Sequence, residues 1–466
     1  CGNVVEVQIP GKDGKEGLTF DRGCWEFTAA GNAYEGPTVI KNGAVLFLDA
    51  NGTIPSTSTV VVGSGGELCT GGGNKTVTDL VLEKDAILGF GTSSSTPYTL
   101  TVTGSLTLPA YAAIALYDSD KPVTTAVTAP GTYAVLQVPA EYAAALAAVR
   151  WSCATASSGN AYTFSVATAG DTATLSMTIA AKPAAGTDFT VAAGENCALG
   201  STSVGSETIT VNGNLLIDGN LTGTGAGGKV IVNNGGVLDV TSSIKPQSTG
   251  ATFDFYLNAG GSLFVRNLQS TESYDTDHPL RFNGGTIYPV ATTTPSTTVT
   301  YPARYSSVLV SDGGVTYDLS HWLDDGRGEE GWYRFNLTAP FDHDPSGAAT
   351  DGGMTVRGTS GETVLLNFGA GFVGSTMNGG IMVEEGGNIV IGSANALANQ
   401  SVTLLPSSHL RQYGSTAYAP VDSLTLGRTG ATAPVQLQVV ANKNNPAFIV
   451  ESLSVLSPVE VSFISS

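Results

Sequence analysis

Between residues 207 and 290, short apolar runs alternate with polar corners that contain asparagine and glycine. Within each run, apolar and polar side chains alternate with a period of about two, which is typical of β-strands that bury one face. Successive corners lie 25 and then 24 residues apart, counted from Gly235 to Gly260 and from Gly260 to Gly284. A near-constant period of this length marks a repeat architecture, and asparagine and glycine adopt the positive φ angles that tight corners need. The pattern predicts stacked strand–corner–strand units of a β-solenoid, with a long β-meander as the alternative.

The presence and regularity of this strand–corner repeat divide the chain into three regions. Residues 1–130 carry shorter and less regular strand–turn units, and we interpret them as a β-rich region with a terminal cap. Residues 131–200 break the repeat and predict a small α+β module. Repeats return in 201–466 and are interrupted at about 291–350 by a stretch that we interpret as an insertion. The predicted fold class is therefore all-β: a Gly-rich β-solenoid with one helix-containing module and one irregular insertion.

Three local patterns depart from the repeat. An alanine-rich run at 143–149 predicts the only convincing helix of the chain. Residues 162–166 and 172–179 predict two strands joined by a turn at Gly170. Residues 20–27 are dense in aromatic and charged side chains, and we interpret them as a cap or a crossing loop.

Composition narrows the class of protein. Charged residues make up 13% of the chain, against about 25% in an ordinary globular domain, while Gly reaches 59 of 466 residues. This balance is typical of a β-rich extracellular protein with many turns. The net charge of −19 argues against nucleic acid and anionic membranes as partners, because both need a basic surface. No apolar run is long enough to span a bilayer, so the sequence predicts no transmembrane segment.

The five cysteines all lie within the first 200 residues, and no two have CxxC spacing. Zinc and thioredoxin-type chemistry are therefore poorly supported. The candidate disulfides are Cys24 with Cys69 and Cys153 with Cys197, and the sequence leaves the pairing open. Cys1 is a candidate lipid-anchored cysteine of a surface protein, and the alternative is that it marks where a processed chain or a fragment begins.

The interval from 321 to 334 is the most charged and aromatic part of the chain, and it suggests two interpretations. In the first, aromatic platforms and neighbouring acids bind a glycan. In the second, which we favour, the aromatic side chains pack back on the solenoid and the acids pair with its arginines. The candidate glycan-binding residues are Trp322, Trp332, Tyr333, Asp324 and Asp325.

Two short acidic clusters are candidate calcium sites, because carboxylates are the ligands that Ca²⁺ prefers. The clusters are Asp275 with Asp277, and Asp342 with Asp344. Neither resembles an EF-hand loop. The sequence therefore suggests no cofactor, with calcium as the alternative.

Catalytic signatures are missing from the chain. None of the four histidines is flanked by glycine on both sides, and the regular repeats offer few bases. No Gly-x-Ser-x-Gly elbow, P-loop or dinucleotide fingerprint stands out. We therefore predict no catalytic residues and a protein that is not an enzyme.

Residues 280–287 (LRFNGGTI) and 386–397 (GGNIVIGSANAL) resemble the autotransporter-associated β-strand repeats of large bacterial surface proteins. The second stretch is similar to that family's pattern of Gly-Gly, a short apolar strand and an Asn-Ala-Leu end. The resemblance covers a third to a half of the chain and implies a secreted or surface-displayed solenoid of the right-handed parallel β-helix type. It also implies adhesion or display without catalysis. The module at 131–200 and the insertion at 291–350 are foreign to this repeat.

These patterns together predict an extracellular structural or adhesive protein of a bacterial surface. Free strand edges at the ends of a solenoid suggest self-association into a fibre or surface layer, and a host or matrix glycan is the other candidate partner. The alternatives are a carbohydrate-binding or polysaccharide-degrading β-helix protein and a phage or virus fibre.

Overall fold

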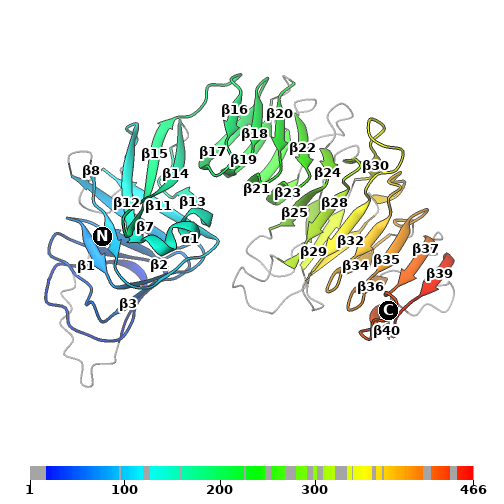
Figure 1. Ribbon diagram of the computed structural model, residues 1–466, viewed down its shortest axis with the longest axis horizontal. Helices are drawn as coiled ribbons and strands as arrows, with labels where there is room; N and C mark the ends of the chain where they lie inside the picture. The colour runs from blue at the N-terminus through cyan, green and yellow to red at the C-terminus, as the bar shows by residue number, and fades with distance from the viewer. Residues whose placement is uncertain are drawn as a thin grey trace. The chain divides into compact units, whose positions relative to one another are not determined.

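The structure is a computed structural model that describes residues 17–93, 96–118, 126–157, 159–224, 227–246, 253–268, 280–290, 298–301, 308–320, 333–337, 339–358, 364–369, 372–393, 395–412, 421–440 and 449–464. Strands account for 58% of the described residues and helix for 3%, and the described parallel strands stack as coils of a β-solenoid of about 15 turns. Figure 1 shows these stacked strands. This confirms the predicted fold class. The chain divides into two compact units. The first contains Cys1–Pro183, Gly194–Gly200 and Asn214–Asp218, and the second contains Ala184–Ala193, Ser201–Gly213 and Gly219–Ser466.

The first unit contains a sheet with the order β10-β6-β3-β2-β4-β7-β11-β13, to which β1 and β8 add at β2 and β7. Its strands are β1 (Leu18–Phe27), β2 (Thr38–Leu48), β3 (Thr59–Val62), β4 (Glu67–Thr70), β6 (Asp79–Leu82), β7 (Ile87–Ser93), β8 (Thr96–Pro97), β10 (Leu106–Thr107), β11 (Tyr111–Tyr117) and β13 (Arg150–Cys153). Parallel pairing aligns Leu46, Leu68 and Leu88 across three coils, and all three are buried in the core. The interpretation of 20–27 as a crossing loop is wrong, because these residues belong to β1, which pairs with β2 along its length.

A second set of strands in the first unit follows the order β14-β15-β12-β9-β5. They are β5 (Lys75–Val77), β9 (Leu100–Val102), β12 (Gly131–Pro139), β14 (Asn160–Ala169) and β15 (Thr172–Ala181). β14 and β15 form an antiparallel hairpin that turns at Gly170 with φ +57°, which confirms the two predicted strands. The predicted helix is confirmed as η1 (Ala140–Tyr142) followed by α1 (Ala143–Ala148). Leu146 is its buried residue, and its carbonyl accepts a 3.0 Å hydrogen bond from Trp151 Nε1.

Neither candidate disulfide forms. Cys69, Cys153 and Cys197 are buried free thiols, whereas Cys24 is disulfide-bonded. Strand β2 separates Cys24 on β1 from Cys69 on β4, so these residues are at least two strand spacings, or about 9–10 Å, apart, which is beyond disulfide reach. Cys153 belongs to the hydrophobic core. On the strand Asn196–Val204 it is Ala198 that points into this core, so its neighbour Cys197 points to the opposite face of the strand, away from Cys153. Burial raises the pKa of all three thiols, for Cys197 to about 12, so they stay protonated at neutral pH.

The second unit is a stack of coils built from three parallel sheets. Sheet 1 contains β16 (Phe189–Val191), β18 (Thr208–Val211), β20 (Lys229–Val232), β22 (Asp254–Asn258), β24 (Leu280–Asn283), β27 (Val308–Val310) and β30 (Phe341–His343). Sheet 2 contains β21 (Val237–Pro246), β23 (Ser262–Leu268), β25 (Gly285–Pro289), β28 (Val315–Asp318), β31 (Met354–Arg357), β33 (Ile381–Val383), β35 (Ser401–Leu404), β37 (Val421–Leu426) and β39 (Val450–Val455), together with β17 (Asn196–Val204) and β19 (Asn214–Gly223), which have residues in both units. Sheet 3 contains β26 (Thr298–Tyr301), β29 (Tyr333–Leu337), β32 (Val364–Phe368), β34 (Asn388–Ile391), β36 (His409–Gln412), β38 (Val435–Val440) and β40 (Val459–Ile464).

Apolar side chains fill the coils of the second unit and line up from one coil to the next. Phe255, Leu280, Val308 and Phe341 are in register on four successive strands of sheet 1, and each is at most 1% exposed. Burying a side chain of this size stabilises the fold by about 1.5–3 kcal/mol. The Phe341 ring lies 6.3 Å from the ring of Tyr317 on sheet 2, so side chains of the two sheets meet inside the coil.

Tyr317 is a polar exception inside this core. Its side chain is fully buried, and its hydroxyl has no hydrogen-bond partner in the described part of the chain. We expect Tyr317→Phe to raise the free energy of unfolding by about 1 kcal/mol, because the substitution removes an unpaired buried hydroxyl without changing the ring. Urea unfolding tests this against Tyr162→Phe, which removes a hydroxyl that accepts a 2.7 Å hydrogen bond from the Ser157 N–H and should therefore destabilise the protein. A loss of stability in Tyr317→Phe would contradict the assignment.

Hydrogen bonds between coils hold the corners that the sequence predicts. The side-chain amide of Asn258 donates to Asn233 Oδ1 at 2.9 Å, and that of Asn233 donates to Asn212 Oδ1 at 2.9 Å. The N–H of Gly235, which has φ +76°, donates to the carbonyl of Gly260, which has φ +74°. Each corner thus stacks on the next through both side chains and backbone.

The interval 291–350 carries coils in its described part and does not depart from the solenoid there. β27 and β28 pair with β24 and β25 of the preceding coil, and β29 pairs with β26. β30 continues sheet 1 in register, with Val310 opposite His343.

Candidate functional site

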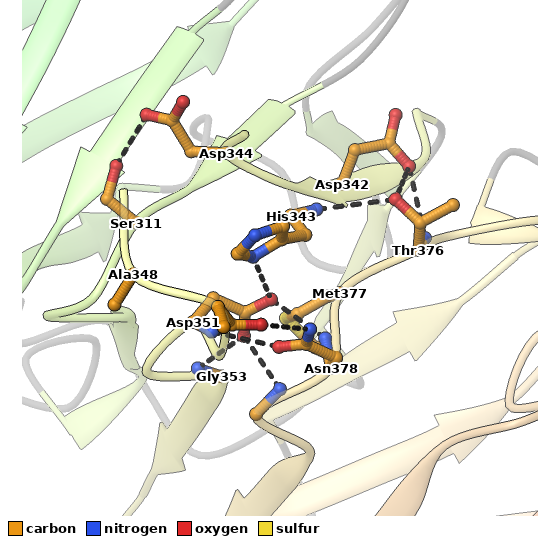
Figure 2. Close-up of polar contacts among 12 residues, drawn as sticks. Ser311, Asp342, His343, Asp344, Ala348, Asp351, Gly353, Thr376, Met377 and Asn378 are labelled. Carbon is orange, nitrogen blue, oxygen red and sulfur yellow. Dashed lines mark hydrogen bonds and ion pairs between the residues drawn. The ribbon is translucent and has the colours of Figure 1, made fainter. Parts of the chain in front are cut away.

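The acidic sequence 342–344 lies at the corner between sheets 1 and 2, and it is the candidate site that the structure describes best (Figure 2). β30 buries Phe341 completely and continues beyond its last residue, since the N–H of Asp344 donates to the carbonyl of Val310 at 2.9 Å. Because side chains alternate along a strand, Asp342 and Asp344 share the face opposite to Phe341. On that face Asp342 is half-buried and Asp344 is buried.

Asp342 hydrogen-bonds to the following coil. Its Oδ1 accepts bonds from the backbone N–H of Thr376 at 3.0 Å and from the Thr376 hydroxyl at 2.9 Å. The Thr376 hydroxyl oxygen also accepts a 3.3 Å bond from the His343 N–H. These contacts connect the end of β30 to the segment that precedes β33.

Asp344 hydrogen-bonds to the preceding coil and to its own loop. Its Oδ2 accepts a 2.7 Å bond from the Ser311 hydroxyl, and its Oδ1 accepts bonds from the N–H and the hydroxyl of Ser346. Burial acts to raise the pKa of Asp344, but the bonds from Ser346 and Ser311 outweigh it and hold the pKa below its ordinary value. The stability that these bonds provide is therefore present at neutral pH and lost as the pH falls through the lowered pKa.

Asp351 has more backbone hydrogen-bond partners than the other acids of this corner, and it does not belong to either acidic cluster identified from the sequence. Its side chain is buried, its Oδ1 accepts the N–H groups of Gly353 and Gly379, and its Oδ2 accepts the N–H of Asn378, all at 2.8–2.9 Å. His343 Nδ1 lies 3.4 Å from Oδ2 (Figure 2). A signal was present, because Asp351 precedes two glycines, as Asn283 and Asn378 do at equivalent corners.

The geometry does not gather the candidate calcium ligands. Figure 2 shows Asp342 and Asp344 on either side of His343, with their bonded oxygens directed to Thr376 and to Ser311. Across the described residues, no group of three or more His, Cys, Asp or Glu side chains has an arrangement that could hold a metal ion. Asp275 and Asp277 lie outside the described residues. Calcium binding stays a prediction without support from this corner.

The candidate glycan site falls almost wholly outside the residues that the structure describes. Trp322, Asp324, Asp325 and Trp332 precede β29 in the interval 321–332. Tyr333 is the first residue of β29, and its side chain is not among those described. Glycan binding by these residues stays a prediction.

The fold and the corner geometry define a class of protein: a parallel β-solenoid whose described polar corner residues hydrogen-bond one coil to another. No family model matches the chain, and no curated protein or solved structure is similar to it at a significant level. The resemblance to autotransporter-associated repeats therefore has no support from these comparisons. No helix within the described ranges is long and apolar enough to cross a membrane.

Proposed function

We propose that the protein is an extracellular, non-enzymatic scaffold that serves a structural or adhesive role at a cell surface. The observation that carries this proposal is the use of polar side chains at the corners. Asn233, Asp344 and Asp351 each form at least one side-chain hydrogen bond to a neighbouring coil. An acid that is bonded in this way fixes the backbone and is poorly placed to move a proton or to leave an open position for a metal.

Two observations support an extracellular location. Cys24 is disulfide-bonded, and disulfides persist mainly in oxidising compartments. The low content of charged residues, 13% of the chain, and the 59 glycines suit a turn-rich protein that functions outside the cell.

The last described coil supports self-association. Leu453 on β39 is 59% exposed, and Val461 and Phe463 on β40 are 52% and 73% exposed. Within the described ranges, β39 and β40 are each paired on one edge only, to β37 and β38. Apolar side chains beside an unpaired strand edge favour pairing with another β-coil, and we propose that a second copy provides it.

Lysine substitutions test this surface directly. We expect Leu453→Lys and Phe463→Lys to abolish concentration-dependent association in sedimentation velocity, because a charge beside a strand edge disfavours pairing. Met382→Lys is the matched control, since Met382 is 38% exposed but lies on β33, which is paired on both edges. Association that is lost equally in all three variants, or that is absent from the wild-type protein, would contradict the proposal.

The adhesive part of the proposal has its own test. A glycan-binding screen with the wild-type chain and with Trp322→Ala and Trp332→Ala variants measures whether the predicted aromatic residues recognise sugars. Binding that the alanine variants lose would support glycan adhesion, and a screen without a hit would leave self-association as the proposed function.

A further inference from the structure

Glu67 is a buried acid of the first unit, and its surroundings disfavour a charge. It begins β4, where it is paired with Val45 on one side and Ile87 on the other, and only 7% of its surface is exposed. Its Oε1 occupies the space beside Gly89, where an added Cβ would lie 2.2 Å from that oxygen. The carboxyl group is thus packed against the backbone of β7.

Among the residues that the structure describes, Glu67 has a neutral hydrogen-bond donor and no cationic partner. The Tyr117 hydroxyl, at the end of β11, donates to Oε1 at 2.7 Å. Two cysteines are the other titratable groups nearby. Cys69 on β4 interacts electrostatically with Glu67, and Cys153 interacts in the same way with Tyr117. Neither cysteine carries a positive charge. Among the described residues no ion pair reaches Glu67. Burial raises the pKa of Glu67, and the bond from Tyr117 offsets only part of this effect.

We propose that Glu67 couples the folding of the first unit to pH: the unit takes up a proton at Glu67 when it folds, and it is more stable in a mildly acidic medium than at neutral pH. The physical cause is that an ionised carboxylate loses its hydration at this position and gains a single hydrogen bond in return. A carboxyl group with a raised pKa in the folded state contributes stability that is complete below its unfolded pKa. That contribution is lost as the pH rises through the folded pKa. This property is independent of the proposed scaffold function.

The test compares the full-length wild-type chain with Glu67→Gln, which keeps the shape and the acceptor for Tyr117 but cannot ionise. Hydrogen–deuterium exchange of peptides from β4, β7 and β11 reports local stability. At about pH 8 we expect slower exchange in Glu67→Gln than in wild type, and at about pH 4 we expect equal exchange, because wild-type Glu67 is then protonated. Glu83→Gln, at an exposed acid of the same unit, should match the wild type at both values.

Two results would overturn the proposal. One is a difference between Glu67→Gln and wild type that is the same at both pH values, and the other is faster exchange of Glu67→Gln at the higher pH. Isotope-edited infrared spectroscopy of the wild-type chain gives a second readout that needs no variant. A protonated glutamic acid that persists above the ordinary glutamate pKa and disappears in Glu67→Gln is the expected result, and a fully ionised Glu67 in that range would also refute the coupling.

Discussion

We expect Asp351→Asn to lower the free energy of unfolding of the second unit by about 3 kcal/mol. The side chain of Asp351 accepts the backbone N–H groups of Gly353, Asn378 and Gly379, and it is buried. An asparagine side chain has the same shape but presents one NH₂ group, which would face one of these donors in either orientation. The substitution therefore leaves at least one buried N–H unpaired and adds a repulsive contact. Urea unfolding, followed by circular dichroism, measures the change as a lower midpoint.

Asp312→Asn is the matched control, because Asp312 occupies the equivalent corner of the preceding coil. It is exposed, and its Oδ1 accepts the N–H of Ala348 at 2.7 Å. We expect a loss of less than about 1 kcal/mol, since water can satisfy the groups at an exposed site. Equal effects in the two variants would show that burial of Asp351 does not determine its contribution.

We expect Gly236→Ala to destabilise the protein by a similar amount, about 3 kcal/mol, for a steric reason. A Cβ at Gly236 would lie 2.1 Å from the carbonyl oxygen of Val211 in the preceding coil. Because the clash is with backbone, no side-chain rotation relieves it, and the two coils must separate. The measurement is again the urea midpoint, with hydrogen exchange in β18 and β20 to locate the damage.

The neighbouring residue provides the control for this steric effect. Gly235 has φ +76°, but an added Cβ would meet nothing within 4 Å. Gly235→Ala therefore costs only the strain of a left-handed conformation, about 1–2 kcal/mol. If Gly235→Ala were the more damaging of the two, close approach of the coils would not be the reason for glycine at position 236.

The corners of the second unit were predictable from the sequence because their chemistry is local. Asn233 and Asn258 occupy the same position in successive repeats and hydrogen-bond to each other. A side chain that bonds to the same position of the next coil tends to be the same residue type in each repeat. The hairpin at Gly170 and the helix at Ala143–Ala148 were predictable for the same reason, since turn and helix propensities act over a few residues.

Features that depend on distant parts of the chain were not predictable. The coils of 291–350 have unequal connections, so their strands fall out of the 24–25-residue period although β27, β28 and β30 keep their register. Whether two cysteines can form a disulfide depends on the strand that lies between them. The spacing of the cysteines along the chain does not reveal that strand.

The acids at the corner between sheets 1 and 2 show the same limit of prediction from the sequence. Asp342 and Asp344 were identified as a cluster from their proximity in sequence, but their partners Thr376 and Ser311 lie more than 30 residues away and in opposite directions along the chain. Burial and contacts between coils decide what an acid does here, and neither is visible in a local charge pattern. Asp351, which has the largest set of backbone partners, stands apart from any charge cluster in the sequence.

Negative-stain electron microscopy of the purified chain over a range of concentrations, with and without millimolar calcium, tests the proposed scaffold function most directly. We expect end-to-end assemblies that grow more abundant with concentration, that form equally without calcium, and that disappear in Phe463→Lys. Particles that remain single at every concentration, or that assemble only when calcium is present, would contradict it.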